Sequence, residues 1–194
     1  DEIIKAAVGS VDAIILTHRH SDHVGAAKEL RDKTGATVIA SAIDAPIISG
    51  EKKLPRDDMR FTPCPVDHVV NDGDILKIGD MPWKVILTPG HTEGGICLFI
   101  DPRFGTNPEG APVLISGDTL FCGSIGRTDF QGGDMNAMRR SLKRWPCCPT
   151  RRWSCPATTA PPRSATNAKG CSLTTRRGSR LTLRRRIARS VPSG

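Results

Sequence analysis

The sequence lacks two features that would place the protein in or across a membrane. No apolar run approaches the roughly 20 residues that a membrane-spanning helix needs. No basic and then apolar leader follows the first residue, Asp1. These absences predict a soluble protein with no membrane partner. Because the first residue is not Met, we expect the chain to be a fragment, and 194 residues favour one domain.

Acidic residues are absent after Asp134. Residues 1–138 contain all 20 acidic residues and 13 of the 28 Lys and Arg residues, so their net charge is −7. The other 15 basic residues give residues 139–194 a charge of +15. The overall charge of +8 would favour nucleic acid or an anionic surface as a partner, but it averages two very different sequences.

The cysteines do not form a regular framework. There are seven of them, an odd number, with Cys64, Cys97 and Cys122 scattered in the first part and the other four after position 146. Secreted disulfide-rich domains have even and regularly spaced cysteines. We therefore expect reduced thiols and a cytoplasmic location.

Residues 1–144 alternate between short β-rich runs and helical patterns. Residues 11–17 (VDAIILT) predict a strand, and apolar residues at helical spacing predict a helix over 23–33 that Gly35 ends. Asp134 is expected to cap a helix that runs to about Arg144. Further strands are predicted at residues 37–40, 83–88, 96–100 and 113–116.

The pattern changes after Trp145, where acids disappear and Pro, Thr and Arg dominate. No period of 2 or 3.6 residues is sustained there. The sequence therefore predicts an incomplete domain over 1–144 and a basic, disordered or frameshifted tail over 145–194.

Three imidazoles and one carboxylate lie within six positions, directly after the first predicted strand. They are His18, His20, Asp22 and His23. Zinc binds nitrogen and oxygen donors at about 2 Å. Alternate residues leaving a strand point the same way, so His18 and His20 can share one ion, and Asp22 and His23 can serve a second. This cluster predicts a metal site.

Two later strands also end at possible ligands. His91 follows one strand in the segment TPGHT, and Asp118 follows another in SGDT. Agreement among three strand ends favours one shared site. His68 is interpreted as structural, and Cys122 as a small residue packed beside the site rather than a thiolate ligand.

The segments HRHSDH, TPGH and SGDTLF resemble the metallo-β-lactamase superfamily over residues 1–144. The resemblance implies an αββα sandwich of the mixed α/β class. It also implies a first metal held by His18, His20 and His91. Asp22 and His23 would contribute to a second metal, and Asp118 would bridge the two.

Residues 123–130 (GSIGRTDF) look like the type II glyoxalase, or hydroxyacylglutathione hydrolase, branch of this superfamily. That branch implies two Zn²⁺ ions and a metal-bound hydroxide that attacks a small-molecule thioester. Asp22 could orient the nucleophile, and Arg127 could position an anionic substrate group or form a structural ion pair.

Other functions stay open at this point. Persulfide dioxygenases share a GRTDF-like segment, and one would hold a single iron through His18, His20 and either His91 or Asp118. Specific nucleic-acid binding through the Arg-rich tail is an alternative of another class, which we do not favour. An exported β-lactamase is disfavoured by the absent leader, whereas lactonases fit the same motifs. The oligomeric state is not predicted.

Two departures from the family pattern concern the ends of the chain. Only seventeen residues precede His18, so we expect the amino-terminal strands of the sandwich to be missing. No histidine follows His91, although the family has a later one in a Pro-Gly-His turn. A shifted reading of GC-rich codons for residues 144–158 permits LALLPDATVVLPGH. We therefore hypothesise that the chain is frameshifted from about Trp145.

Overall fold

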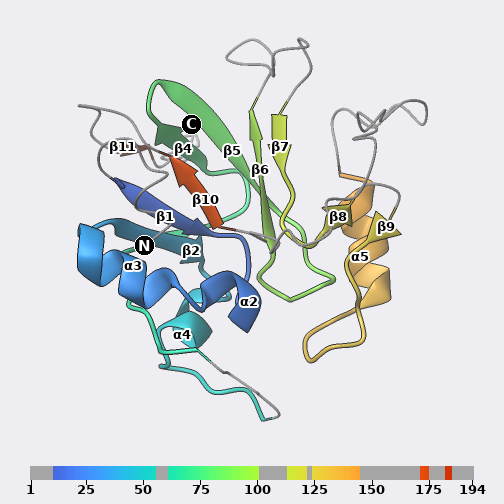
Figure 1. Cartoon of the computed structure of the whole chain (residues 1–194). Helices are drawn as coiled ribbons and strands as arrows, with labels where there is room; N and C mark the ends of the chain where they lie inside the picture. Colours follow the sequence, from blue (N-terminus) through green and yellow to red (C-terminus); the bar gives the residue numbers. More distant parts are fainter. Residues whose placement is uncertain are drawn as a thin grey trace, which may run out of the picture.

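The computed structural model describes residues 11–55, 61–100, 113–121, 124–144, 171–174 and 182–184. These residues form two main sheets and one small ribbon (Figure 1). The strand order is β10-β1-β2-β3 in the first sheet and β11-β4-β5-β6-β7 in the second. The two sheets lie face to face around a shared apolar core.

The first sheet is built on three parallel strands. They are β1 (Ala13–Leu16), β2 (Thr37–Ser41) and β3 (His68–Val70). Helices α2 (Ser21–Val24), α3 (Ala27–Thr34) and α4 (Ala45–Ile48) lie along one face of this sheet (Figure 1). Ile14 and Leu16 pack in the helix-side core, whereas Ala13 and Ile15 pack in the core between the sheets. This double burial explains why β1 is continuously apolar.

The second sheet is antiparallel. Its strands are β4 (Ile75–Ile78), β5 (Met81–Leu87), β6 (Ile96–Ile100) and β7 (Val113–Ile115). Leu76, Trp83, Val85 and Leu98 face the first sheet in the shared core. Ile96 is hydrogen-bonded through its N–H to the carbonyl of Thr17, which ties β6 to the end of β1.

A short ribbon and a helix complete the part that surrounds the site. The ribbon consists of β8 (Leu120–Phe121) and β9 (Ser124–Ile125), and helix α5 spans Met135–Leu142. Asp134 caps α5 by accepting hydrogen bonds from two backbone N–H groups in its first turn, as the sequence predicts. The Ser141 hydroxyl donates to the carbonyl of Pro89 at 2.7 Å, so α5 is attached to the turn after β5.

The predicted strands are present with small changes in their ends, but the helix predicted over 23–33 is two helices. Helix α2 begins at Ser21, inside the histidine motif, and α3 begins at Ala27. Gly35 ends α3 in the left-handed conformation, as predicted. The early start brings Asp22 and His23 into the first turn of a helix. The sequence pattern did not predict α4, β3, β4, β8 or β9.

Two short strands come from the region predicted as a tail. Strand β10 (Cys171–Thr174) runs antiparallel to β1, and β11 (Thr182–Arg184) runs antiparallel to β4. The remaining residues of that region lie outside the described part. The domain boundary at residue 144, the predicted disorder and the frameshift stay predictions. Among the described residues, every helix is too short or too polar to cross a membrane.

Candidate metal centre

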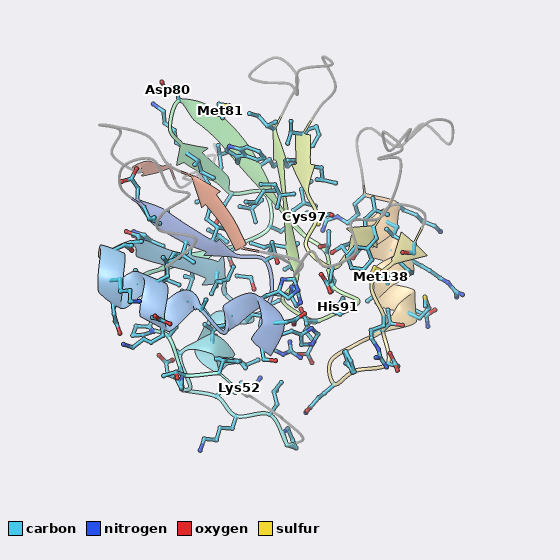
Figure 2. All side chains as sticks on the ribbon, in the orientation of Figure 1. Lys52, Asp80, Met81, His91, Cys97 and Met138 are labelled. Carbon is cyan, nitrogen blue, oxygen red and sulfur yellow. The ribbon has the colours of Figure 1, made fainter. Side chains whose placement is uncertain are left out.

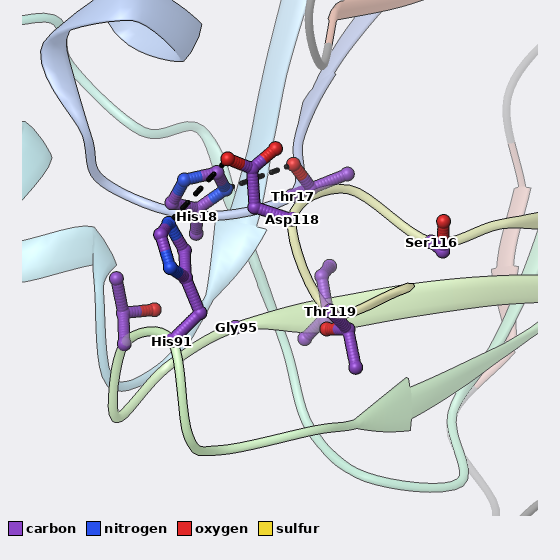
Figure 3. A pocket seen from close by; sticks show the side chains of 9 residues that line it. Thr17, His18, His91, Gly95, Ser116, Asp118 and Thr119 are labelled. Atoms are coloured by element: carbon purple, nitrogen blue, oxygen red, sulfur yellow. Dashed lines mark hydrogen bonds and ion pairs between the residues drawn. The ribbon is translucent and has the colours of Figure 1, made fainter. Parts of the chain in front are cut away.

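The predicted ligands meet at one edge of the two sheets. His18 and His20 follow β1, His91 follows β5, and Asp118 follows β7, while His23 comes from helix α2. The carboxyl ends of these strands therefore converge, as the three motifs predict. Figure 3 shows His18, His91 and Asp118 pointing toward one another in a pocket that Thr17 and Thr119 also line.

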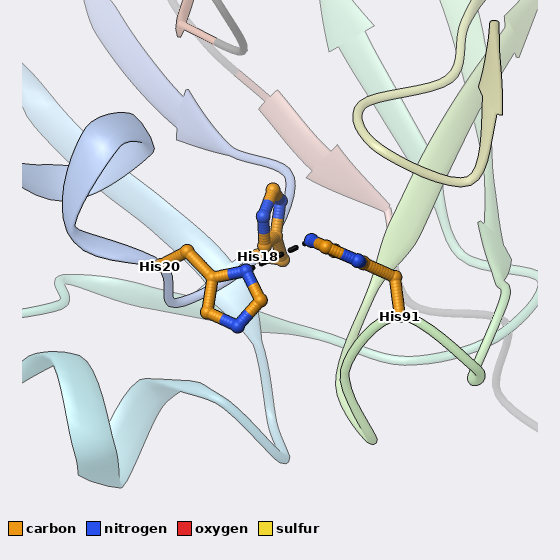
Figure 4. Close-up of side chains that lie close together, drawn as sticks. All are labelled: His18, His20 and His91. Carbon is orange, nitrogen blue, oxygen red and sulfur yellow. Dashed lines mark hydrogen bonds between the residues drawn. The ribbon is translucent and has the colours of Figure 1, made fainter. Parts of the chain in front are cut away.

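The first group consists of His18, His20 and His91. One nitrogen of each ring lies within 4.8 Å of the others. His20 Nδ1 and His91 Nε2 are only 2.8 Å apart (Figure 4). Three imidazole nitrogens that converge in this way form a suitable set of ligands for Zn²⁺ or Fe²⁺.

The second group consists of His18, His23 and Asp118, and the same distance limit applies. Asp118 Oδ1 lies 3.2 Å from His23 Nε2, and its Oδ2 lies 3.6 Å from His91 Nε2. Asp118, a member of the second group, is therefore also close to His91 of the first group. This is the position that a bridging ligand would need.

Asp22 is at the rim of this arrangement. Its side chain is 59% exposed, and its Oδ2 lies 3.7 Å from His23 Nε2, farther than the Asp118 carboxylate. It belongs to neither three-residue group. Its role as a metal ligand and its role in catalysis stay predictions.

Several buried nitrogens at the centre have no hydrogen-bond partner. Within the described part of the chain, they are His18 Nε2, His23 Nδ1 and His23 Nε2. His23 Nε2 lies within ion-pair distance of Asp118, yet the two are not aligned for a hydrogen bond. Buried polar atoms without partners are costly and rare. A bound cation would satisfy His18 Nε2 and His23 Nε2, so the residues fit a metal site.

Two neighbours orient the histidine rings. His18 Nδ1 lies 3.2 Å from the Thr17 hydroxyl, which leaves Nε2 for a metal. His91 Nδ1 lies 2.7 Å from the carbonyl oxygen of Arg127. Because a carbonyl can only accept, Nδ1 carries the proton and the Nε2 lone pair faces the site.

Burial keeps these rings in the form that binds metals. Burial, with smaller contributions from His91 and Arg19, lowers the pKa of His20 to about 4. Burial also lowers the pKa of His18, and His23 is the next contributor. Both rings are therefore neutral at pH 7, and neutral imidazole is the coordinating form.

Arg127 is paired on the surface beside the site. Its Nε and Nη2 donate to the Asp129 carboxylate at 2.7 and 2.6 Å. Its guanidinium also lies 3.9 Å from the centre of the Phe130 ring, which is nearly perpendicular to the His20 ring, with the two ring centres 5.6 Å apart. Of the two roles that the sequence analysis left open for Arg127, the structure thus contains the ion pair, with Asp129. Substrate binding by Arg127 stays a prediction.

Sequence reasoning missed a buried pair behind the site, Arg19 and Asp44. Their side chains are 4% and 1% exposed, and Arg19 Nη1 lies 2.9 Å from Asp44 Oδ1. Burial raises the pKa of Asp44, and Arg19 opposes that shift. Asp44 is far from the motifs in sequence. The one local signal is its position directly before the short helix α4.

Two further sequence interpretations concern His68 and Cys122. His68 lies on β3, is exposed and belongs to neither of the metal-binding groups found among the described residues. Its interpretation as structural stays a prediction. Cys122 lies outside the described residues, so its packing stays a prediction.

Comparisons with known proteins match this geometry. The sequence profile of the Metallo-beta-lactamase superfamily matches residues 2–146. Hydroxyacylglutathione hydrolase GloC of Haemophilus influenzae is 32% identical over 140 residues, which are 69% of this chain and 61% of that protein. The chain thus spans less than two thirds of this relative.

Two solved structures have similar folds. BLEG-1 B3 metallo-beta-lactamase matches with a TM-score of 0.54 and 33% identity, over 69% of this chain and 62% of that one. ETHE1 from Myxococcus xanthus matches with a TM-score of 0.53 and 26% identity, over 74% and 51%. Because the profile covers most of the chain and the predicted ligands converge, this protein belongs to the metallo-beta-lactamase superfamily.

Proposed function

We propose that the chain is a metal-dependent hydrolase that acts on a small thioester of the hydroxyacyl-thiol type. The observation that carries this proposal is the pair of adjoining ligand groups, in which Asp118 of the second group also lies close to His91 of the first. The similarity to hydroxyacylglutathione hydrolases supports the thioester as substrate. Zn²⁺ is the proposed metal, with two ions expected and the second held more weakly.

His18, His20 and His91 would hold the first ion, and His23 and Asp118 would contribute to the second, with Asp22 at its rim. When bound, the ions supply Lewis acidity, which polarises a carbonyl and lowers the pKa of a coordinated water. The protein contributes neutral, buried imidazoles whose orientation is set by Thr17 and by the carbonyl of Arg127.

The exposed residues at the rim of the site would contact the substrate and the solvent. Asp22 faces solvent beside His23, so its carboxylate can accept a hydrogen bond from an entering water and orient it. Phe130 is 47% exposed and has its ring next to His20, so it forms an apolar wall for the acyl or thiol group. Arg127 would attract a substrate carboxylate, partly displacing Asp129.

Metal titration combined with a thioester assay tests this proposal. The purified chain should bind Zn²⁺ and hydrolyse S-lactoylglutathione, and chelation should abolish the activity. His91→Ala should lose both properties, whereas the exposed His68→Ala is the matched control and should keep both. Zinc binding without thioester hydrolysis would refute the substrate while leaving the metal site intact.

A mononuclear persulfide dioxygenase is the second candidate. The first ligand group by itself supplies three nitrogen ligands, enough to hold one iron. This function predicts oxygen consumption on glutathione persulfide by the Fe²⁺-loaded chain. Thioester hydrolysis without oxygen consumption would exclude it.

A further inference from the structure

Asp44 contacts two ligand-bearing segments although it is not a ligand itself. Its Oδ2 accepts hydrogen bonds from the backbone N–H of Arg19 at 3.0 Å and from the Thr92 hydroxyl at 3.3 Å. Arg19 lies between His18 and His20, and Thr92 directly follows His91. One carboxylate therefore joins the two segments that supply all three residues of the first metal group.

The Arg19 side chain strengthens the same connection. Its Nη1 donates to Asp44 Oδ1 at 2.9 Å, and its Nη2 donates to the carbonyl of Gln131 at 2.9 Å. Glu93, 56% exposed, lies 3.3 Å from Nη1. Because Arg19 N–H and Nη1 contact different oxygens of one carboxylate, the backbone between His18 and His20 is held in one orientation.

From its position in the chain, the Asp44 side chain would be expected to cap helix α4. It lies at the N-cap of α4, where an aspartate ordinarily accepts from the helix N–H groups, yet its side chain makes no cap hydrogen bond. Gly94 leaves room for this orientation, because a Cβ at position 94 would collide with Asp44 Oδ1 and lie 2.7 Å from Ser41 Oγ. The Asp44 carboxylate therefore accepts hydrogen bonds from Arg19 and Thr92 instead of capping α4.

We propose that Asp44 is a positioning residue of the metal site. It fixes the spacing between the His18–His20 segment and His91, and so sets the affinity and geometry of the first metal position. A buried ion pair contributes little net stability, whereas metal affinity depends strongly on how outer residues hold the ligands. The inference rests on the metal site of the proposed function.

The test uses the full chain and two probes, Zn²⁺ for affinity and Co²⁺ for the visible spectrum of the bound ion. Asp44→Asn should weaken Zn²⁺ binding by about 10- to 100-fold and alter the Co²⁺ bands. Thr92→Val removes a single hydroxyl and should weaken binding by about 3- to 10-fold, whereas Thr92→Ser keeps the hydroxyl and should bind like the parent.

Asp67→Asn is the matched control. Asp67 accepts from the Arg31 guanidinium at 2.8 Å and from the backbone N–H of Val38 at 2.8 Å, so its chemistry resembles that of Asp44. It contacts no ligand-bearing segment through these bonds. This variant should lower the urea midpoint without changing Zn²⁺ affinity or the Co²⁺ spectrum.

The outcomes separate the two proposals. If the parent fails to bind Zn²⁺, the metal site is refuted and the role of Asp44 with it. If the parent binds, and Asp44→Asn and Thr92→Val bind with the parent's affinity and spectrum, only the positioning role is overturned. If Asp44→Asn does not fold, Thr92→Val compared with Thr92→Ser decides the question. Equal losses in Asp67→Asn and Asp44→Asn would also contradict positioning.

Discussion

His18 shows how a single residue is prepared for metal binding. It is 3% exposed, its Nδ1 faces Thr17, and its Nε2 has no hydrogen-bond partner. It lies close to the members of both ligand groups, but Nε2 is the one ring nitrogen left for a metal, so His18 can coordinate a single ion, the first in the proposed function.

The first prediction at this scale concerns His18. His18→Ala should mainly reduce occupancy of the first position and weaken Zn²⁺ binding there by at least about 100-fold. His23→Ala should mainly reduce occupancy of the second position. Metal content after dialysis, measured by elemental analysis, checks this. Loss of the same metal position in the two variants would contradict this assignment of His18 and His23.

The second prediction concerns the pH dependence of the metal-free chain. The pKa of His20 is about 4 in the folded state and 6.5 ordinarily. Between these values the unfolded chain takes up a proton that the folded chain does not. The free energy of unfolding should therefore fall as pH decreases from 6.5 to 4, with no such dependence above 6.5.

Urea unfolding in the presence of a chelator measures this dependence. His20→Gln should reduce the slope between pH 6.5 and pH 5, where carboxylates titrate little. His18 acts in the same direction, so part of the slope should persist in this variant. An unchanged slope in His20→Gln would show that His20 is not kept neutral by burial.

At the scale of elements, the turn after β5 depends on its contact with helix α5. Gly90 has a φ of 146°, and a Cβ there would lie 2.5 Å from Met138 Cα. His91, which directly follows Gly90, and Met138 of α5 are both labelled in Figure 2. The N–H of Asp134 also donates to the carbonyl of Gly90, so the turn that presents His91 and the start of α5 form one unit.

Gly90→Ala should therefore lower the free energy of unfolding by roughly 2–5 kcal/mol, since it adds backbone strain to a collision with α5. Gly73→Ala is the matched control: its φ is 83°, but a Cβ there meets nothing within 4 Å. It should cost only about 1 kcal/mol. Urea denaturation compares the two variants, and equal costs would show that the contact with α5 is unimportant.

At the scale of the whole molecule, the charge asymmetry and the comparisons distinguish two parts. The profile match ends at residue 146, close to the point where acidic residues disappear and the net positive charge begins. The tail nevertheless contributes β10 and β11, which pair with β1 and β4. Replacing this region therefore tests the frameshift hypothesis directly.

Restoring the alternative reading frame from about residue 145 should add a histidine in a Pro-Gly-His turn. We expect this form to bind a second Zn²⁺ more tightly and to hydrolyse S-lactoylglutathione at least about 10-fold faster. The comparison uses both full chains at saturating Zn²⁺. Equal activities and equal second-site affinities would contradict the frameshift account, as would resequencing that finds an intact frame encoding this tail.

Much of the fold and site could be predicted from local sequence. Strand β1 is apolar on both faces, and the strand ends are followed by His18, His91 and Asp118, so the convergence of these residues was predicted. The break between α2 and α3 was not predicted, because Ala26 and Ala27 continue a helical pattern across it.

The sequence by itself determined the types of the proposed ligands and the strands that present them, because both follow from short-range spacing and side-chain chemistry. Tertiary structure decided which residues hold those ligands in place. Asp44 contacts Arg19 and Thr92 across 25 and 48 positions, and Arg127 reaches His91 through a backbone carbonyl. Such contacts depend on the packing of distant segments, and a backbone carbonyl has no side-chain identity that a sequence could show.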